Sequence, residues 1–554
     1  MANFLEAIFT QLKSAGDRVV LREVSGETFT VVTGRELLAN VQRVRSYVRK
    51  FGLTAGDRCA LLGKNSIEWI SVDLALMAEG VLVVPLYPRQ AAGELLAMMK
   101  DAQPNLLVVG EGDLVKGIGR DWKDRPHRVS MEEMLRIAPA REAVVEGPIA
   151  REAHDLVTII YTSGTSGDAK GVCLNVGNVT HMLKCTGERL DQLMGKAKYA
   201  DRVFHYLPFN FAGSWILLLS CLSRDSVLTL SSDLNRLADE IRVSAPNYFL
   251  NVPTLLERVR RGVLDSIAKQ SFPIRMLFAR ATQSWERERE TKFGRLDAVD
   301  ALALGLGRRL IFNKVKKRFG GNLRALICGS APLAVETQEF FMMMGIPVLQ
   351  VYGLTETTAI CTMDDPAIPV EPGYVGQAIS GIEMKIGENQ EIVVRGPHIF
   401  PGYWNKPGET ARVLKEGWFH SGDQGEQNKL GNWKIVGRIK NLIILNSGHN
   451  VAPEPIEERV MQLLRGMQQV VVVGNGRGYL CALIAGKTTR AAVQRAIDAV
   501  NADLPHYRQV RNFTLLREPL TADDGLLTAN GKYRRDAIDR RFTREIAEMY
   551  GAKP

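Results

Sequence analysis

Paired cysteines, metal-binding histidine motifs and long uninterrupted apolar runs are all missing from this sequence. Its seven cysteines are scattered without a C-x-x-C pair, and its eight histidines show no H-E-x-x-H spacing. An odd number of dispersed cysteines argues against a disulfide framework or a zinc site, and it is typical of buried thiols in a reducing compartment. The sequence therefore predicts a cytoplasmic protein.

Neither a cleaved leader nor a membrane-spanning helix is expected. The opening MANFLEAIFTQLKSAGDR has no positive segment before its apolar residues and no small-residue cleavage site. The most apolar long stretch, 211–230, is interrupted by Arg224 and Asp225, so it falls short of the ~20 apolar residues that a spanning helix needs. We expect a buried helix followed by a strand in this stretch.

The charge balance is basic, with a net charge of +10. Such a balance suits polyanionic partners such as nucleotides, coenzyme A, nucleic acid or an anionic membrane face, although an ordinary solvated surface explains it equally well. None of the recognised nucleic-acid-binding modules occurs, so we expect no nucleic-acid partner. The basic segment 254–322 is expected to be helical, and a solvated helix face is favoured there over a membrane or phosphate role.

Short apolar runs alternate with helix-length segments through much of the chain, which predicts βαβ units and mostly parallel sheets. Such runs stand at 58–63, 81–88, 106–110, 226–230, 248–253, 323–329 and 347–353. From about residue 373, glycine-rich turns separate short β runs, which predicts a β-rich subdomain. The expected fold class is α/β, with a large N-terminal domain of parallel sheets flanked by helices and a small mobile α/β domain at the C-terminal end.

The strongest motif is YTSGTSGDAKG at 161–171, which follows the strand pattern DLVTII. Glycines let a backbone bend around a polyphosphate, N–H groups and hydroxyls donate hydrogen bonds, and a lysine adds positive charge. Neither the Walker A spacing nor G-x-G-x-x-G fits, and a plain surface loop is the less favoured alternative. The expected phosphate contacts are Thr162, Ser163, Gly164, Thr165, Ser166, Gly167 and Lys170.

This loop resembles the phosphate loop of the adenylate-forming superfamily, which contains acyl-CoA synthetases, peptide-synthetase adenylation domains and firefly-type luciferases. Further segments similar to the family's motifs follow in order: GSAPL at 329–333, VYGLTETT at 351–358, GWFHSGD at 417–423, GRIKNLIILNSGHNVAPEPIE at 437–457 and ANGKYRR at 529–535. Because these segments span most of the chain in one order, the resemblance is specific.

The resemblance assigns the nucleotide to two of these segments. Small residues after the strand in GSAPL would let a flat adenine approach the backbone, although a strand-end turn is the alternative. In VYGLTETT, the resemblance implies that Tyr352 stacks on adenine, Thr355 binds the α-phosphate and Glu356 binds Mg²⁺, which prefers hard oxygen ligands. The expected contacts are Gly329, Ser330, Ala331, Tyr352, Gly353, Thr355 and Glu356.

The remaining site residues come from the later motifs. Asp423 is the expected ligand of the ribose hydroxyls, because a carboxylate accepts two such hydrogen bonds, and a turn aspartate is its alternative. Arg438 resembles the family's second ribose ligand. Lys532 resembles the lysine that bridges the substrate carboxylate and the α-phosphate, where a cation is needed because both groups are negative. Lys532 is one of 71 lysines and arginines, so only the motif singles it out.

The resemblance also implies two domains, 1–439 and 440–554, with Lys440 as the hinge. In the family the small domain rotates after adenylation, so that the loop at Gly448 replaces the Lys532 loop and helps to form a tunnel for the thiol. One or two residues that change φ and ψ suffice for a hinge. Asn441 departs from the pattern, since many relatives carry an acidic residue there.

The acyl pocket is expected beside the segment YLPFNFAG at 206–213. Its expected lining is Phe209, Phe211 and Trp215, and Phe211 stands where long-chain relatives often have histidine. An apolar wall without an acidic partner for an amine favours a fatty-acid-like substrate, because each buried CH₂ contributes about 0.8 kcal/mol. The alternative is that these aromatic residues belong to the protein core.

The reaction implied by the resemblance has two steps. ATP and Mg²⁺ convert a fatty-acid-like carboxylate into acyl-AMP with release of pyrophosphate, and coenzyme A then accepts the acyl group. Two alternatives stay open: loading of a carrier-protein phosphopantetheine, or a catalytically silent scaffold that binds acyl groups or nucleotides. The intact Lys170, Glu356, Asp423, Arg438 and Lys532 argue against the scaffold. A peripheral membrane contact is possible.

Overall fold

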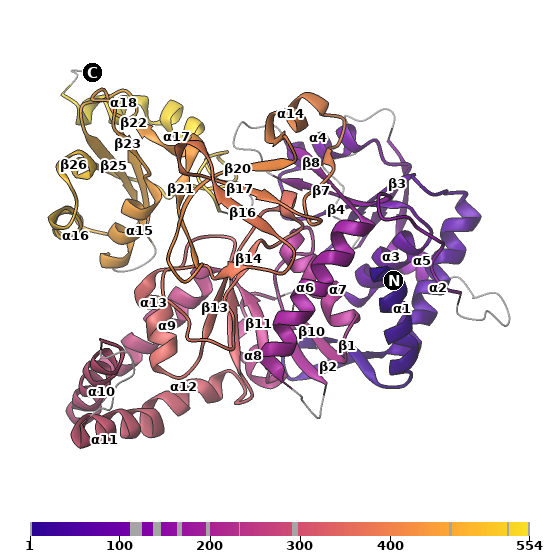
Figure 1. Cartoon of the computed structure of the whole chain (residues 1–554), viewed down its shortest axis with the longest axis horizontal. Helices are drawn as coiled ribbons and strands as arrows, with labels where there is room; N and C mark the ends of the chain where they lie inside the picture. The colour runs from indigo at the N-terminus through magenta and orange to yellow at the C-terminus, as the bar shows by residue number, and fades with distance from the viewer. Residues whose placement is uncertain are drawn as a thin grey trace.

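The computed structural model describes residues 3–110, 125–136, 146–162, 169–195, 200–231, 233–290, 297–464, 468–528 and 531–551. Figure 1 shows a large body that ends with the strands labelled β20 and β21, and a smaller unit at the C-terminal end of the chain. In the described residues, no helix combines the length and the apolar character needed to cross a bilayer.

The first sheet of the body has the strand order β18-β8-β7-β4-β3-β5-β6. Its strands are β3 (Arg58–Leu62), β4 (Leu82–Leu86), β5 (Leu106–Val109), β6 (His127–Ser130), β7 (Leu156–Thr162), β8 (Lys170–Asn175) and β18 (Gly402–Tyr403). Strands β3 to β7 are parallel, whereas β8 and β18 are antiparallel to their neighbours. Strands β3 and β4 are buried on both faces, which explains their unbroken apolar sequences.

The second sheet has the strand order β15-β14-β13-β12-β11-β9-β10-β1-β2. Its strands are β1 (Val19–Ser25), β2 (Thr28–Thr33), β9 (Asp201–His205), β10 (Ser226–Leu230), β11 (Tyr248–Asn251), β12 (Ala325–Cys328), β13 (Val348–Tyr352), β14 (Thr362–Met363) and β15 (Gln377–Ala378). The central strands, from β1 across to β13, are parallel. Their carboxyl ends therefore meet at one edge, where open α/β sheets bind ligands.

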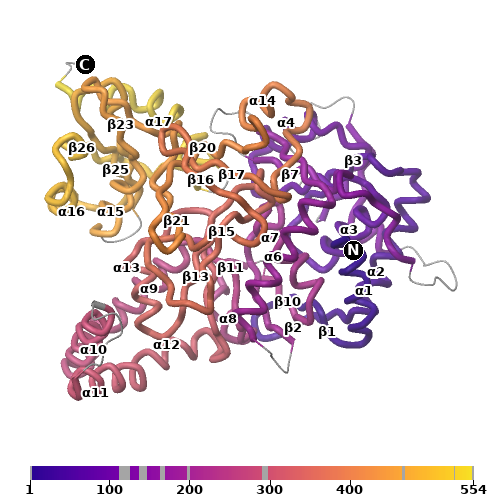
Figure 2. The backbone as a smooth tube through the Cα atoms, in the orientation of Figure 1, coloured from indigo at the N-terminus to yellow at the C-terminus, as the bar shows by residue number. Residues whose placement is uncertain are grey.

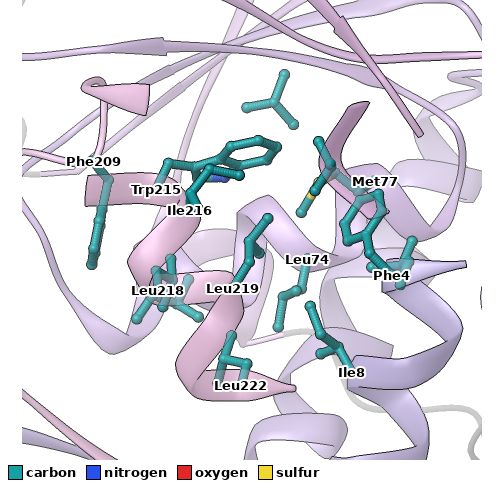
Figure 3. Close-up of a cluster of buried hydrophobic side chains, with 14 of the residues drawn as sticks. Phe4, Ile8, Leu74, Met77, Phe209, Trp215, Ile216, Leu218, Leu219 and Leu222 are labelled. Atoms are coloured by element: carbon teal, nitrogen blue, oxygen red, sulfur yellow. The ribbon is translucent and has the colours of Figure 1, made fainter. Parts of the chain in front are cut away.

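Helices fill the space between the two sheets and cover their outer faces. One core lies between the sheets, and Figure 3 shows side chains of α1, α3 and α7 meeting there. Helix α4 covers the outer face of the first sheet, and α8, α9, α12 and α13 cover that of the second. The bounds are α1 (Phe4–Ala15), α2 (Gly34–Phe51), α3 (Ile67–Ala78), α4 (Ala92–Ala102), α5 (Met131–Leu135), α6 (Val176–Met194), α7 (Ala212–Leu222), α8 (Leu237–Ser244), α9 (Pro253–Ala268), α12 (Asn313–Arg318) and α13 (Val335–Met343).

A β-rich subdomain and the C-terminal unit complete the fold. The subdomain contains β16 (Glu383–Ile386), β17 (Glu391–Arg395), α14 (Pro407–Val413), β19 (Leu414–Lys415), β20 (Trp418–Gln427) and β21 (Trp433–Arg438). The C-terminal unit contains β22 (Ile443–Ile444), β23 (Asn450–Val451), α15 (Glu454–Leu463), β24 (Gln469–Val473), β25 (Leu480–Ala485), α16 (Arg490–Ala502), β26 (Val510–Leu516), α17 (Arg535–Arg541) and α18 (Thr543–Met549). It has hydrophobic clusters of its own. The expected α/β architecture is confirmed.

Two sequence expectations about single segments are also settled. The stretch 211–230 forms helix α7 and strand β10, as expected. The basic segment 254–322 is helical, and α10 (Phe272–Glu290) and α11 (Ala298–Gly307) form a hairpin that projects from the body in Figures 1 and 2. The expectation of a solvated polar face is wrong for α11, whose exposed side chains are apolar.

Candidate active site

A buried carboxylate lies at the centre of the predicted nucleotide site. Tyr352, at the carboxyl end of β13, donates its hydroxyl proton to Asp423 Oδ2 at 2.9 Å. Arg438 Nε lies 2.8 Å from Asp423 Oδ1, and the two residues are partners in the antiparallel β20–β21 pair. Asp423 is therefore a strand residue and not a turn residue. Burial raises the pKa of Asp423, while the cations of Arg438, Lys440 and Lys532 oppose that shift.

Glu356 lies in the short turn that follows β13 and shares this site. Its Oε1 accepts a hydrogen bond of 2.8 Å from the hydroxyl of Tyr403, which the sequence did not single out. In the described residues no group of three or more His, Cys, Asp or Glu side chains is placed to hold a metal. A lone carboxylate suits Mg²⁺, which is usually bound by one or two carboxylates together with substrate phosphates and water. Glu356 thus fits the predicted magnesium ligand.

Lys170 stands where the predicted phosphate loop ends. Thr162 and Lys170 face each other in the last pair of the β7–β8 ladder, whereas Ser163, Gly164, Thr165, Ser166 and Gly167 lie outside the described residues. The Lys170 ammonium is 2.6 Å from a carboxylate oxygen of Glu409 and 5.2 Å from the ring centroid of Tyr403. The hydrogen bond with Lys170 lowers the pKa of Glu409. Glu409, like Tyr403, was missed in the sequence.

Two lysines of the C-terminal part add further positive charge. Crowding by protein reduces the hydration of Lys440 and, with the nearby Arg438 cation, lowers its pKa to about 8. The same two causes lower the pKa of Lys532. Both ammonium groups also interact electrostatically with the carboxylates of Asp423 and Glu356. Cations from several distant segments therefore meet at this site. An excess of cations creates a positive electrostatic potential, which favours the binding of a polyphosphate.

Specific contacts hold the Lys532 loop over this site. The Thr528 N–H donates to the Lys532 carbonyl at 2.8 Å, and the Lys532 N–H donates to the Thr528 hydroxyl at 3.1 Å. Arg534 pairs with Glu94 of the body. Arg535 forms two hydrogen bonds, of 2.7 and 2.8 Å, with the buried Glu457 of α15. The loop is therefore anchored to the body through Glu94 and to the C-terminal unit through Glu457.

Comparison with known proteins agrees with this geometry. The model of the AMP-binding enzyme family matches residues 8–404, and the model of the AMP-binding enzyme C-terminal domain matches residues 440–554. The chain belongs to the AMP-binding enzyme family. The resemblance to the adenylate-forming superfamily is thereby confirmed.

Relatives of this AMP-binding enzyme match nearly its whole length. The long-chain-fatty-acid–CoA ligase FadD15 of Mycobacterium bovis is 26% identical, over 99% of this chain and 97% of its own. The chloroplastic long-chain-fatty-acid–[acyl-carrier-protein] ligase AEE15 of Arabidopsis thaliana is 25% identical, over 97% of this chain and 85% of its own. The adenylation domain of a Mycobacterium chelonae carboxylate reductase has the same fold, with a TM-score of 0.76 and 20% identity over 100% of this chain and 91% of that chain.

The glycines and small residues predicted to contact the nucleotide lie at the strand ends of this AMP-binding enzyme. A Cβ on Gly353 would come within 2.1 Å of the Ala359 carbonyl oxygen, so the turn bearing Thr355 and Glu356 requires glycine there. Gly329 packs against β13, and a Cβ would lie 2.5 Å from a methyl group of Val351. Ser330, with a φ of 73°, and Ala331 are exposed after β12.

The segment that joins the β-rich subdomain to the C-terminal unit is short. Arg438 ends β21, a single 3₁₀ turn spans Ile439–Asn441, and β22 begins at Ile443. The Asn441 side-chain amide donates to the Glu454 carboxylate at 2.6 Å, where an acidic residue would be repelled, and this contact gives a physical reason for the departure at that position. Gly448 lies in the exposed turn between β22 and β23 with a φ of 82°.

The three aromatic residues predicted to line the acyl pocket lie in two different environments. Phe209 and Trp215 are buried in the core between the sheets, and the Trp215 indole donates to Asp73 at 2.9 Å. Figure 3 shows both among core side chains, which is the alternative considered for them. Phe211, at the start of α7, is only half-buried. Beside it, the side-chain oxygens of Asn210 and Ser214 are buried with no protein hydrogen-bond partner among the described residues, so polar groups also face this region.

Proposed function

We propose that this AMP-binding enzyme activates a fatty-acid-like carboxylate with ATP and transfers the acyl group to the thiol of coenzyme A. The observation that carries the proposal is the convergence of Lys532, Lys440, Arg438 and Lys170 around the carboxylates of Asp423 and Glu356. These residues come from both family-matched regions and the segment between them. Such a site binds an anionic nucleotide and stabilises charge at phosphorus.

In the first step, the residues of this site position two anions for reaction. Asp423 accepts hydrogen bonds from the ribose hydroxyls, since each of its oxygens keeps a lone pair beside Arg438 and Tyr352. Lys532 lies between the substrate carboxylate and the α-phosphate, so that a carboxylate oxygen can attack phosphorus while the bond to pyrophosphate breaks. Glu356 and Lys170 hold the pyrophosphate end. Glu356 would also bind Mg²⁺, and the ion would neutralise phosphate charge there.

In the second step, a thiolate attacks the acyl carbonyl of acyl-AMP, and AMP leaves as the acyl–oxygen bond breaks. We propose that domains 1–439 and 440–554 rotate about Lys440 between the steps, which removes Lys532 and brings the Gly448 turn to the site. The single turn Ile439–Asn441 between two strands supports this hinge, because few residues need to change φ and ψ.

The choice of acid and thiol rests on relatives that match nearly the whole chain. FadD15 is named as a long-chain-fatty-acid–CoA ligase, which favours a fatty acid and coenzyme A. AEE15 is named as a ligase for the acyl-carrier protein, so loading of a carrier-protein phosphopantetheine is the second candidate. The net charge of +10 suits either acceptor, because coenzyme A and carrier proteins are both acidic.

The proposal is tested by ATP–pyrophosphate exchange with short, medium and long fatty acids, aryl acids and amino acids. We expect exchange to rise with fatty-acid chain length, because each added CH₂ that is buried contributes about 0.8 kcal/mol. Thioester formation with coenzyme A and with a phosphopantetheinylated carrier protein then decides the acceptor. Exchange with aryl or amino acids alone would exclude the fatty-acid substrate, and no exchange with any acid would exclude adenylation of these substrates.

The depressed pKa of Lys440 predicts a pH dependence of ATP capture. Its cation is present below a pKa of about 8 and is lost as the pH rises through that value. We therefore expect kcat/KM for ATP, which reports the free enzyme, to fall as the pH rises through about 8. Lys440→Arg keeps the positive charge and should move this fall to higher pH. The same pH profile in both enzymes would exclude Lys440 as its cause.

A further inference from the structure

Apart from Asp300, helix α11 consists of glycine and apolar residues, although it lies on the outside of the molecule. Val299, Leu302, Leu306 and Leu310 follow one another at i, i+3, i+7 and i+11 along α11 and the single π-helical turn Arg308–Phe312 that continues it, so they share one face. Their exposed fractions are 63%, 64%, 40% and 44%. We call these four residues the α11 ridge. A helix with so apolar a sequence is normally buried in protein or lipid.

The one charged residue of α11 does not reach the solvent. The carboxylate of Asp300 is buried and lies 2.7 Å from the guanidinium groups of both Arg280 and Arg287 on α10. It also accepts a hydrogen bond of 2.9 Å from the Ser284 hydroxyl. These contacts hold α11 on α10 by a different face and leave the α11 ridge uncovered, with no charged side chain of α11 beside it.

The hairpin is closely packed and projects from the body. A Cβ on Gly307 would lie 2.7 Å from that of Ala281, so the two helices approach closely at this point. Figures 1 and 2 show α10 and α11 side by side at the lower left, beyond the other helices of the body. Two further apolar residues, Phe272 and Met276 on α10, are 64% and 57% exposed. The projecting arm therefore offers apolar surface of the kind that marks a binding site.

A run of positive charge begins within the last turn of the ridge, includes Leu310 and continues beyond it. Residues 308–318, RRLIFNKVKKR, contain no acidic residue. Arg308, Arg309, Lys314, Lys317 and Arg318 are exposed. Apolar side chains next to clustered lysines and arginines are the combination by which a helix lies in the interface of an anionic bilayer.

We propose that the α10–α11 hairpin docks on an anionic lipid surface, with the α11 ridge in the interface and the basic run 308–318 against the headgroups. Charge complementarity selects this partner over a second copy of the chain. A symmetric dimer through the ridge would bring two basic runs close together, and their repulsion would oppose it. Docking needs no catalysis, so this proposal stands or falls independently of the proposed reaction.

The test is co-sedimentation of the full chain with two kinds of vesicle: phosphatidylcholine alone, and phosphatidylcholine with one third phosphatidylglycerol. We expect binding to the anionic vesicles only, weakening with added salt as exposed charges are screened. Leu302→Ser combined with Leu306→Ser should weaken this binding by about tenfold or more, because two apolar side chains no longer enter the interface. The matched control is Leu430→Ser with Leu463→Ser, two residues that are 71% and 55% exposed elsewhere. The control should bind like the wild type.

A second pair of variants tests the charge. Lys314→Gln with Lys317→Gln should weaken binding to the anionic vesicles, and Lys429→Gln with Lys487→Gln, which removes the same charge from other exposed sites, should leave it unchanged. Circular dichroism establishes that each variant is folded. The proposal is overturned if the wild-type protein does not bind the anionic vesicles. It is also overturned if a folded ridge variant binds them as the wild type does. A dimer in light scattering that dissociates only in the ridge variant, without vesicle binding, would identify a second copy as the occupant and also overturn it.

Discussion

Replacement of Lys532 by alanine should lower ATP–pyrophosphate exchange by about 10²–10³-fold, the loss typical when one group that stabilises transition-state charge is removed. The physical reason is local. The Lys532 ammonium lies among Arg438, Asp423 and Glu356. In the proposed reaction, this is where the substrate carboxylate and the α-phosphate approach each other. Without its charge, the repulsion between these two anions is unscreened. Exchange assays under saturating ATP and acid measure the effect on kcat.

Two comparisons show whether the loss of exchange in Lys532→Ala comes from the missing ammonium group or from a general loss of enzyme function. Lys487→Ala removes an exposed lysine of the same C-terminal unit and should leave exchange unchanged. Chemically prepared acyl-AMP, supplied to Lys532→Ala together with coenzyme A, should still give the thioester at nearly the wild-type rate, because the proposed second step uses the other face of the unit. Exchange by Lys532→Ala within a factor of two of the wild type would exclude the bridging role.

The fold was largely predictable because its strands carry strong local signals. Parallel strands buried on both faces must be continuous apolar runs, and β3, β4 and β12 are of this kind. The stretch 211–230 was assigned correctly because Arg224 and Asp225 interrupt it between the helix and the strand. In α11, the basic residues that follow the helix suggested a polar face. The packing of Asp300 against Arg280 and Arg287 of α10 withdraws the one charge of α11 from the surface, so its exposed side chains are apolar.

The site was predictable only where motifs identify its residues. Tyr352, Asp423 and Arg438 belong to recognisable segments, and the structure joins them directly. Tyr403 and Glu409 carry no local signal, because their contacts depend on the pairing of β18 with β8 across more than two hundred residues. The aromatics near α7 illustrate another limit. A pocket wall and a protein core need the same apolar residue types, so periodicity and composition do not separate them.

The second large effect that we expect is on stability. Glu457→Gln should destabilise the C-terminal unit by about 3 kcal/mol, because removal of one charge from a buried pair leaves the other uncompensated. Glu457 is 3% exposed, and its carboxylate holds both outer nitrogens of Arg535 and the Val472 N–H at 2.7–2.8 Å. The Arg535 guanidinium would keep its charge without its closest partner. Hydrogen exchange at the amides of β24 and β25 measures the local loss of protection.

A surface pair in the same unit provides the matched control for Glu457→Gln. Arg544 and Glu548 form an ion pair of 2.9 Å on exposed positions of α18, so Glu548→Gln should cost only about 0.3–0.5 kcal/mol. Equal effects of the two substitutions would contradict the importance of the buried pair.

Arg535 is three residues from Lys532, so a loosened anchor should also displace the bridging lysine. We therefore expect folded Glu457→Gln to lose exchange activity while it still forms the thioester from supplied acyl-AMP, since only the first step depends on the position of Lys532.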